Sequence, residues 1–141
     1  MEVTRRGTLM SGASLLLALG LPGALRAQDV TAEQAVAAFA GGAPLVPGGV
    51  SLRLDPVAED GFKVPVVVAA EGAEALMIVA PRNPVPVIAL ARFGPLAVAP
   101  MLSTRMRLAR TQEVMALARM ADGTVRQVAQ RVEVIVGGCG A

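Results

Sequence analysis

The sequence predicts an all-β protein, an antiparallel β-sandwich that follows one short N-terminal helix and ends in a flexible, glycine-rich C-terminal tail. Seven or eight short apolar segments have strand length. Turn residues separate them about every 8–12 residues, as is typical of a sandwich. No long helical pattern lies between these segments. The only cysteine, Cys139, lies between glycines two residues from the C-terminus, where the chain can bury very little.

The first 27 residues have the pattern of an export signal. Arg5 and Arg6 precede an apolar run from Leu9 to Leu21, which ends at Pro22-Gly23. That run is too short for a spanning helix, which needs about 20 apolar residues. We interpret residues 1–27 as a twin-arginine signal peptide cleaved after Ala27, which predicts a periplasmic protein with no stable membrane anchor. A retained membrane anchor is the alternative.

Residues 28–136 are expected to form one domain, and a helix is expected at its start. Thr31 and Gln34 have the spacing of a capping box, and apolar residues at helical spacing follow as far as Phe39. Gly41-Gly42 ends this run, so the pattern predicts a helix over 31–40. Residues 44–49 contain two prolines and two glycines and are expected to be a linker.

The remaining body has strand patterns, which are alternating apolar and polar residues in some segments, such as 50–55 and 104–109, and apolar runs of strand length in 64–70 and 75–80. Strand patterns occur at 50–55, 64–70, 75–80, 87–92, 104–109 and 114–120. Asp122-Gly123 then gives the signal of a β-hairpin turn. On the last predicted strand Val128, Val132, Val134 and Val136 lie on one face, and residues 137–141 form the tail.

Composition excludes several function classes. The chain has no His, and therefore lacks the commonest general base and metal ligand. One cysteine cannot form an intrachain disulfide or a cysteine-rich metal site, so we expect neither a metal nor another cofactor. After the signal, acids and bases balance, which disfavours nucleic-acid binding.

Charge is nevertheless uneven along the body. Residues 75–141 carry eight arginines against three acids. This excess would suit a small anionic cargo or an acidic partner surface. Arginines spread over solvated strand faces are the equally good alternative.

The tail and four upstream segments resemble one known family. Val134 to Gly140 reads V-I-V-G-G-C-G and is similar to the C-terminus of SoxY, the sulfur-carrying subunit of bacterial Sox thiosulfate oxidation. The upstream matches, in the family's order, are Glu59-Asp60-Gly61 with Val64-Pro65-Val66, Asn83-Pro84 with Pro86, Ser103 to Ala109 with Gln112, and Asp122-Gly123. Asp60 stands where the family usually has Asn, and Ala141 where it usually has a final Gly.

The resemblance implies a fold, a partner and a covalent role for one residue. It implies an immunoglobulin-like sandwich in a heterodimer with SoxZ, a second small β-protein. It further implies that Cys139 carries the substrate: haem-containing SoxAX joins thiosulfate to the thiol, and SoxB releases sulfate. A sulfur dehydrogenase, where present, would oxidise the remaining sulfane sulfur.

The tail chemistry itself favours a carrier over an enzyme. An ordinary thiol has a pKa near 8.5 and is only about 3% ionised at pH 7. The nearest cation in the sequence is Arg131, so activation must come from a partner enzyme. Gly137, Gly138 and Gly140 give the tail flexibility. Three alternatives remain: an exported immunoglobulin-like binding module with an incidental cysteine, an interaction subunit whose cysteine only forms an intermolecular disulfide, and a free-standing enzyme.

Overall fold

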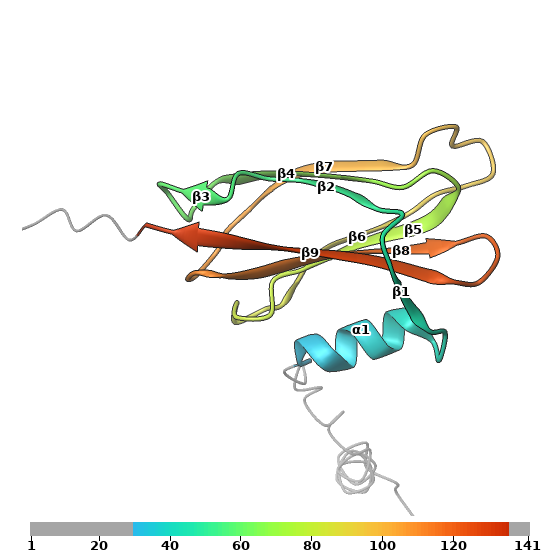
Figure 1. The fold of residues 1–141 in the computed structure, drawn as a ribbon, viewed down its shortest axis with the longest axis horizontal. Coiled ribbons are helices and arrows are strands. Elements are labelled where there is room, and N and C mark those ends of the chain that lie inside the picture. Colours follow the sequence, from blue (N-terminus) through green and yellow to red (C-terminus); the bar gives the residue numbers. More distant parts are fainter. Residues whose placement is uncertain (1–29, 136–141) are drawn as a thin grey trace, which may run out of the picture.

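The alternating strand residues assemble two sheets over a shared core, with the helix against the outside of the larger sheet (Figure 1). The structure is a computed structural model that describes residues 30–135. The larger sheet has the strand order β1-β9-β8-β5-β6, with β3 also paired to β9, and the smaller sheet has the order β2-β4-β7. In chain order the elements are α1 (Ala32–Ala40), β1 (Leu45–Pro47), β2 (Ser51–Arg53), β3 (Val57–Ala58), β4 (Val64–Ala69), β5 (Ala73–Val79), β6 (Val87–Arg92), β7 (Met101–Met106), β8 (Gln112–Met120) and β9 (Val125–Val134).

The core between the sheets is aliphatic. Its most deeply buried side chains include Val66, Val68, Leu76, Ile78, Val114 and Val132. Burial of such side chains contributes about 1.5–3 kcal/mol each, which makes this layer the main source of stability. Val132 is buried here and both Val128 and Val134 pack against it, which confirms the predicted shared face for these three residues. Val136, the fourth, lies outside the described residues.

Helix α1 covers the outer face of the larger sheet. Its N-terminus has the predicted capping box, in which the Gln34 amide donates to Thr31 Oγ1 and the Thr31 amide donates to Gln34 Oε1. The helix ends at Gly41, whose φ of 59° gives the left-handed cap. Phe39 packs with a second apolar cluster that includes Met77, Val79 and Leu117. The predicted helix is therefore present, with Thr31 as its cap.

Two short strands in the sandwich run parallel to β9. β1 pairs with the start of β9, and β3 pairs with its end. Residues 44–49, predicted to be a linker, therefore contain a strand. Their backbone hydrogen-bonds to β9 as far as Gly48, whose amide donates to the Gln127 carbonyl at 2.9 Å. A φ of 85° at Gly48 lets the chain turn away there.

One predicted strand is displaced along the chain. Residues 104–109 alternate as a strand does, but β7 ends at Met106. The alternation of buried and exposed side chains continues beyond the strand, since Leu108 is still buried. Its amide donates to the Gly61 carbonyl at 2.8 Å. A neighbouring loop thus replaces the sheet as its partner. The first predicted strand, over 50–55, is shorter than expected and consists of β2 alone.

The β8–β9 turn confirms the predicted hairpin. The Met120 amide donates to the Thr124 carbonyl at 2.9 Å, and Gly123 has a φ of 83°. The Thr124 hydroxyl and amide both donate to Asp122 Oδ1. These hydrogen bonds hold the pKa of Asp122 below its usual value, because they stabilise the ionised carboxylate. Within residues 30–135 no helix is long and apolar enough to cross a membrane.

Candidate functional site

The residues predicted to carry the function lie outside the described part of the chain. Cys139 and its glycines at 137, 138 and 140 belong to the C-terminal tail, and Arg5 and Arg6 belong to the N-terminal segment. What the structure describes is the place where the chain enters the tail. That place is the end of β9, at one end of the sandwich (Figure 1).

The end of β9 is held from both sides. On one side the amides of Glu133 and Ile135 donate to the carbonyls of Pro56 and Ala58 at 2.8 and 2.9 Å. On the other side the Val134 amide donates to Thr111 Oγ1 at 3.0 Å. The backbone is thus fixed as far as Ile135. Cys139 follows four residues later, so its extended reach from Ile135 is about 14 Å.

Two loops near this exit are joined by two amide side chains. Gln112 is 2% exposed; its Oε1 accepts from the Arg82 amide at 2.8 Å and its Nε2 donates to Asn83 Oδ1 at 3.0 Å. Asn83 Oδ1 also accepts from the Ala109 amide at 3.0 Å, and its Nδ2 donates to the Arg107 carbonyl. The β5–β6 loop and the β7–β8 loop are therefore linked by side chains rather than by a strand ladder.

A groove of about 410 Å³ lies beside the same exit. Its walls are Glu59 to Phe62, Arg107 to Ala109, Val134 and Ile135. The Arg107 guanidinium lies 4.6 Å from the centre of the Phe62 ring, close enough for a cation–π contact. At Gly61 a Cβ would lie 2.6 Å from the Leu108 carbonyl oxygen, so this close approach of two loops requires glycine. The groove offers one guanidinium, two carboxylates and apolar walls.

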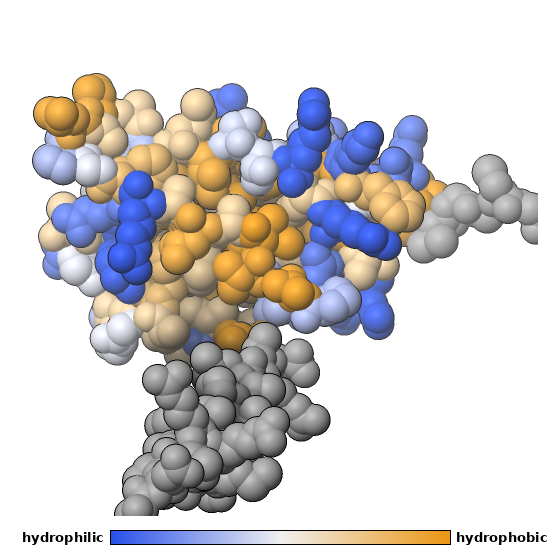
Figure 2. All heavy atoms as spheres, turned by 180° about the vertical axis from the view of Figure 1, so that it is seen from behind, coloured by the Kyte–Doolittle hydropathy of each residue, from blue (hydrophilic) through white to orange (hydrophobic). Residues whose placement is uncertain are grey.

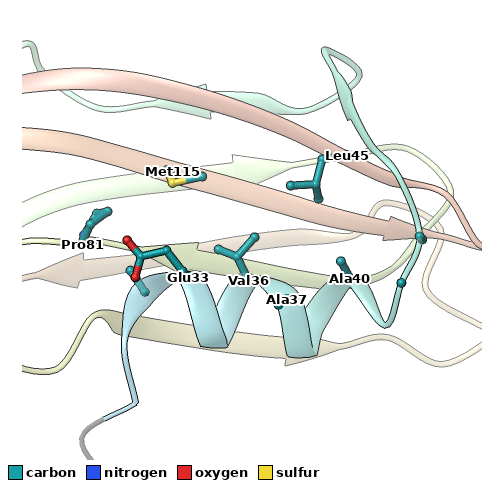
Figure 3. Close-up of a pocket in the computed structure, with 10 residues that line it drawn as sticks. Glu33, Val36, Ala37, Ala40, Leu45, Pro81 and Met115 are labelled. Carbon is teal, nitrogen blue, oxygen red and sulfur yellow. The ribbon is translucent and has the colours of Figure 1, made fainter.

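A second groove, of about 460 Å³, lies between α1 and the larger sheet (Figure 3). Its lining is mostly apolar and includes Val36, Ala40, Leu45 and Met115. The Glu33 carboxylate lies at its rim. Such a lining can bind an apolar group but supplies no nucleophile. Within residues 30–135 no three His, Cys, Asp or Glu side chains gather closely enough to hold a metal ion.

The segments that resemble a known family converge on the tail exit. Parts of three of these segments lie at this end and are joined by the contacts above: Glu59 to Gly61, Asn83, and Arg107 to Ala109 with Gln112. Asp122-Gly123 lies at the opposite end of β8.

Sequence reasoning gave Thr111 no role and did not connect Gln112 with Asn83. One signal could have directed attention to them. Gln112 is a polar residue at the start of the apolar pattern of β8, and Thr111 directly precedes it.

The chain matches one family model, described as sulfur oxidation protein SoxY, over residues 36–139. A solved structure of the sulfur carrier protein SoxY from Chlorobium limicola f thiosulfatophilum is similar, with 29% identity and a TM-score of 0.66. That similarity covers 74% of this chain and 96% of the other.

A superoxide reductase (neelaredoxin) from Ignicoccus hospitalis shares the fold alone. It has 13% identity and a TM-score of 0.53, over 62% of this chain and 80% of that one. Comparison with curated protein sequences gives no match.

Proposed function

The chain belongs to the SoxY family of sulfur oxidation proteins, and we propose that it carries sulfur intermediates of thiosulfate oxidation covalently on Cys139. The observation that carries this proposal is the extent of the family match, which continues through the tail to Cys139 itself. The geometry at the tail exit supports it, because a strand fixed up to Ile135 leads directly into a short glycine-rich segment with one thiol.

The proposed loading step is an oxidation at sulfur. The Cys139 thiol and thiosulfate join through a new S–S bond, releasing one proton and two electrons, which a SoxAX-like enzyme accepts one at a time by reducing two equivalents of Fe(III) haem to Fe(II). The product is an S-thiosulfonate of Cys139. Water then cleaves its terminal S–S bond in a SoxB-like enzyme, leaving a persulfide on Cys139 and releasing sulfate and a proton. A sulfur-dehydrogenase-like enzyme would oxidise the persulfide sulfur further.

In this proposal the protein itself is a carrier and not an enzyme. All three steps need a base, a redox centre or an activated water, which the partner enzymes supply. The tail supplies reach and access: glycines at 137, 138 and 140 place no side chain beside the thiol and leave the backbone free to turn. No cofactor beyond the bound sulfur is required of this chain.

A stable companion subunit is also part of the proposal. The family implies a complex within the Sox system, and we assign the companion as a SoxZ-like β-protein. The loop between β6 and β7 supports such a contact. Its Leu96 and Val98 side chains are 92% and 94% exposed, and the segment from Gly94 to Met101 has no charged residue. Exposed uncharged aliphatic surface of this kind is typical of lasting interfaces.

Export by the twin-arginine pathway places the carrier in the periplasm. The support is the sequence pattern around Arg5 and Arg6. Changing both to Lys should leave the precursor in the cytoplasm, because the translocase requires the arginine pair. Fractionation followed by immunoblotting would measure this, and normal periplasmic levels of the double variant would refute the assignment.

Replacement of Cys139 by Ser tests the carrier role. Thiosulfate-dependent respiration should be abolished, since a hydroxyl cannot form the S–S bond. Secondary structure and binding to the companion subunit should be unchanged, because the proposed role of Cys139 depends only on the reactivity of its thiol. A Cys139→Ser strain that still oxidised thiosulfate would sink the proposal.

A further inference from the structure

At the end of the β8–β9 ladder, a hydrogen bond to a side chain replaces the expected backbone hydrogen bond. Gln112 faces Val132 in the antiparallel register, so the next partner of Val134 along this ladder would be Arg110. The chain has left the sheet before that point, however, since β8 begins at Gln112. The Val134 amide donates to the Thr111 hydroxyl instead. Thr111 Oγ1 thus takes the place of a missing strand carbonyl.

The Arg110 carbonyl that would have served is bonded elsewhere. Gln112 Nε2 donates to it at 3.2 Å while also donating to Asn83 Oδ1 at 3.0 Å. Since Gln112 is almost fully buried and both ends of its amide are bonded, its orientation is fixed. The loop before Thr111 is fixed in turn by Asn83, which bonds the backbone of Arg107 and Ala109. The backbone on both sides of Thr111 is therefore held by this polar network, and the Thr111 carbonyl itself accepts from Arg82 Nη1 at 3.3 Å.

The remaining contacts at this point come from the opposite side. The amides of Glu133 and Ile135 donate to the segment that carries β3. The Val134 amide points the other way and donates to the Thr111 hydroxyl. Without the Thr111 bond, one side of the last strand residues would be free to separate from the sheet. The end of β9 would then be held through the β3 side alone, and this local opening would widen the directions in which the tail can leave.

From this geometry we infer that Thr111, held by Asn83 and Gln112, is a positioning residue that fixes where and in which direction the tail leaves the sandwich. The inference rests on the proposed carrier function. A thiol on a short tail must enter partner sites with defined geometry, and a displacement of about 1 Å can reduce such rates severely. Thr111 acts through the backbone of Val134 and does not contact the cargo.

The test compares Thr111→Val, which keeps the shape but loses the hydroxyl, with Thr111→Ser, which keeps the hydroxyl. Amide hydrogen exchange at Val134 should become about fivefold faster in Thr111→Val, as expected for the loss of one hydrogen bond. Exchange at Val132 should stay unchanged. Thr111→Ser should match the wild type at both amides. Thr111→Ala serves as a second hydroxyl-free variant, because it is smaller and cannot clash.

Function is measured with the full chain in complex with its companion subunit, using thiosulfate and the haem-containing loading enzyme. Loading of Thr111→Val and Thr111→Ala should slow by about three- to tenfold. The rate of alkylation of Cys139 by iodoacetamide should not change, because a small reagent needs no docking geometry. Recovery of the wild-type loading rate in Thr111→Ser completes the expected result.

Two outcomes would overturn the inference. Normal loading in both hydroxyl-free variants would show that the tail exit needs no such anchor, and slow loading in Thr111→Ser would show that the hydroxyl is not the cause. Failure of the proposed function looks different: the wild-type protein itself would take up no sulfur, and the positioning role would fail with it.

Discussion

The two ends of the sandwich differ in the residues that form them. At the end where β9 finishes, buried or partly buried amides and a hydroxyl join the loops and fix the backbone. At the other end, the β6–β7 loop extends Leu96 and Val98 almost fully into solvent. Figure 2 shows an apolar cluster at the far end and several hydrophilic side chains near the end of β9, with another apolar group in the middle of the face and further hydrophilic side chains below the far-end cluster. β8 runs between the two ends over nine residues, which separates them by about 26 Å.

This difference separates two kinds of contact. In the proposed function, polar contacts that fix a backbone define the starting point of a tail that would meet several enzymes briefly. Exposed aliphatic side chains suit one partner that remains bound, because their burial supplies lasting free energy. If the proposed companion subunit binds the far end, the tail end stays open to the proposed partner enzymes. The arrangement therefore predicts that damage at one end leaves the other end working.

Introducing charge into the far end should have the largest effect. We expect Leu96→Asp combined with Val98→Asp to weaken binding of the companion subunit by at least about 100-fold, because two carboxylates would be desolvated in the contact. The two side chains make almost no contact with the body, so the melting temperature of the isolated chain should stay the same. Analytical ultracentrifugation of the mixed subunits measures the affinity.

The matched control for this variant is Leu96→Ser with Val98→Thr, which removes apolar area without adding charge and should weaken binding less. Alkylation of Cys139 should proceed at the wild-type rate in both variants. If the charged variant still bound its companion normally, the far end would not be the interface and the division between the ends would fail.

A smaller effect is expected from stiffening the tail. Gly138→Val should slow enzymatic loading and sulfate release, because a β-branched residue restricts the backbone and crowds the thiol. The free energy of unfolding should remain within about 0.5 kcal/mol of the wild type. Companion binding at the far end should also be unchanged. Comparing turnover with the rate of simple alkylation separates docking from thiol reactivity, and equal losses in both would argue that the tail packs against the body.

The sequence was sufficient for the sandwich because its information is local. The apolar run of β4, the capping box at Thr31 and the Asp122-Gly123 turn each depend on neighbours within a few residues. The short strands β1 and β3 could not be predicted in the same way. Their two or three residues have no periodicity to read, and each finds its partner on β9 about 75 to 80 residues away.

The candidate site was predictable only in its chemistry. The assignment of Cys139 rests on its glycine neighbours and on the family match, and it stays a prediction because the residue lies outside the described part of the chain. The role of Thr111 was not recognisable, since it depends on where β8 starts relative to β9. Asn83 and Gln112 are 29 positions apart, and only the folded chain brings their amides to 3.0 Å. Polar networks of this kind have no sequence period.

The most direct test of the central claim is the mass of the C-terminal peptide. The protein would be purified from cells that are oxidising thiosulfate, digested without reductant and analysed by mass spectrometry. The carrier account predicts sulfane or sulfonate adducts on Cys139, and their loss after treatment with dithiothreitol. A Cys139 found only as the free thiol, or only in a disulfide with another protein, would contradict it.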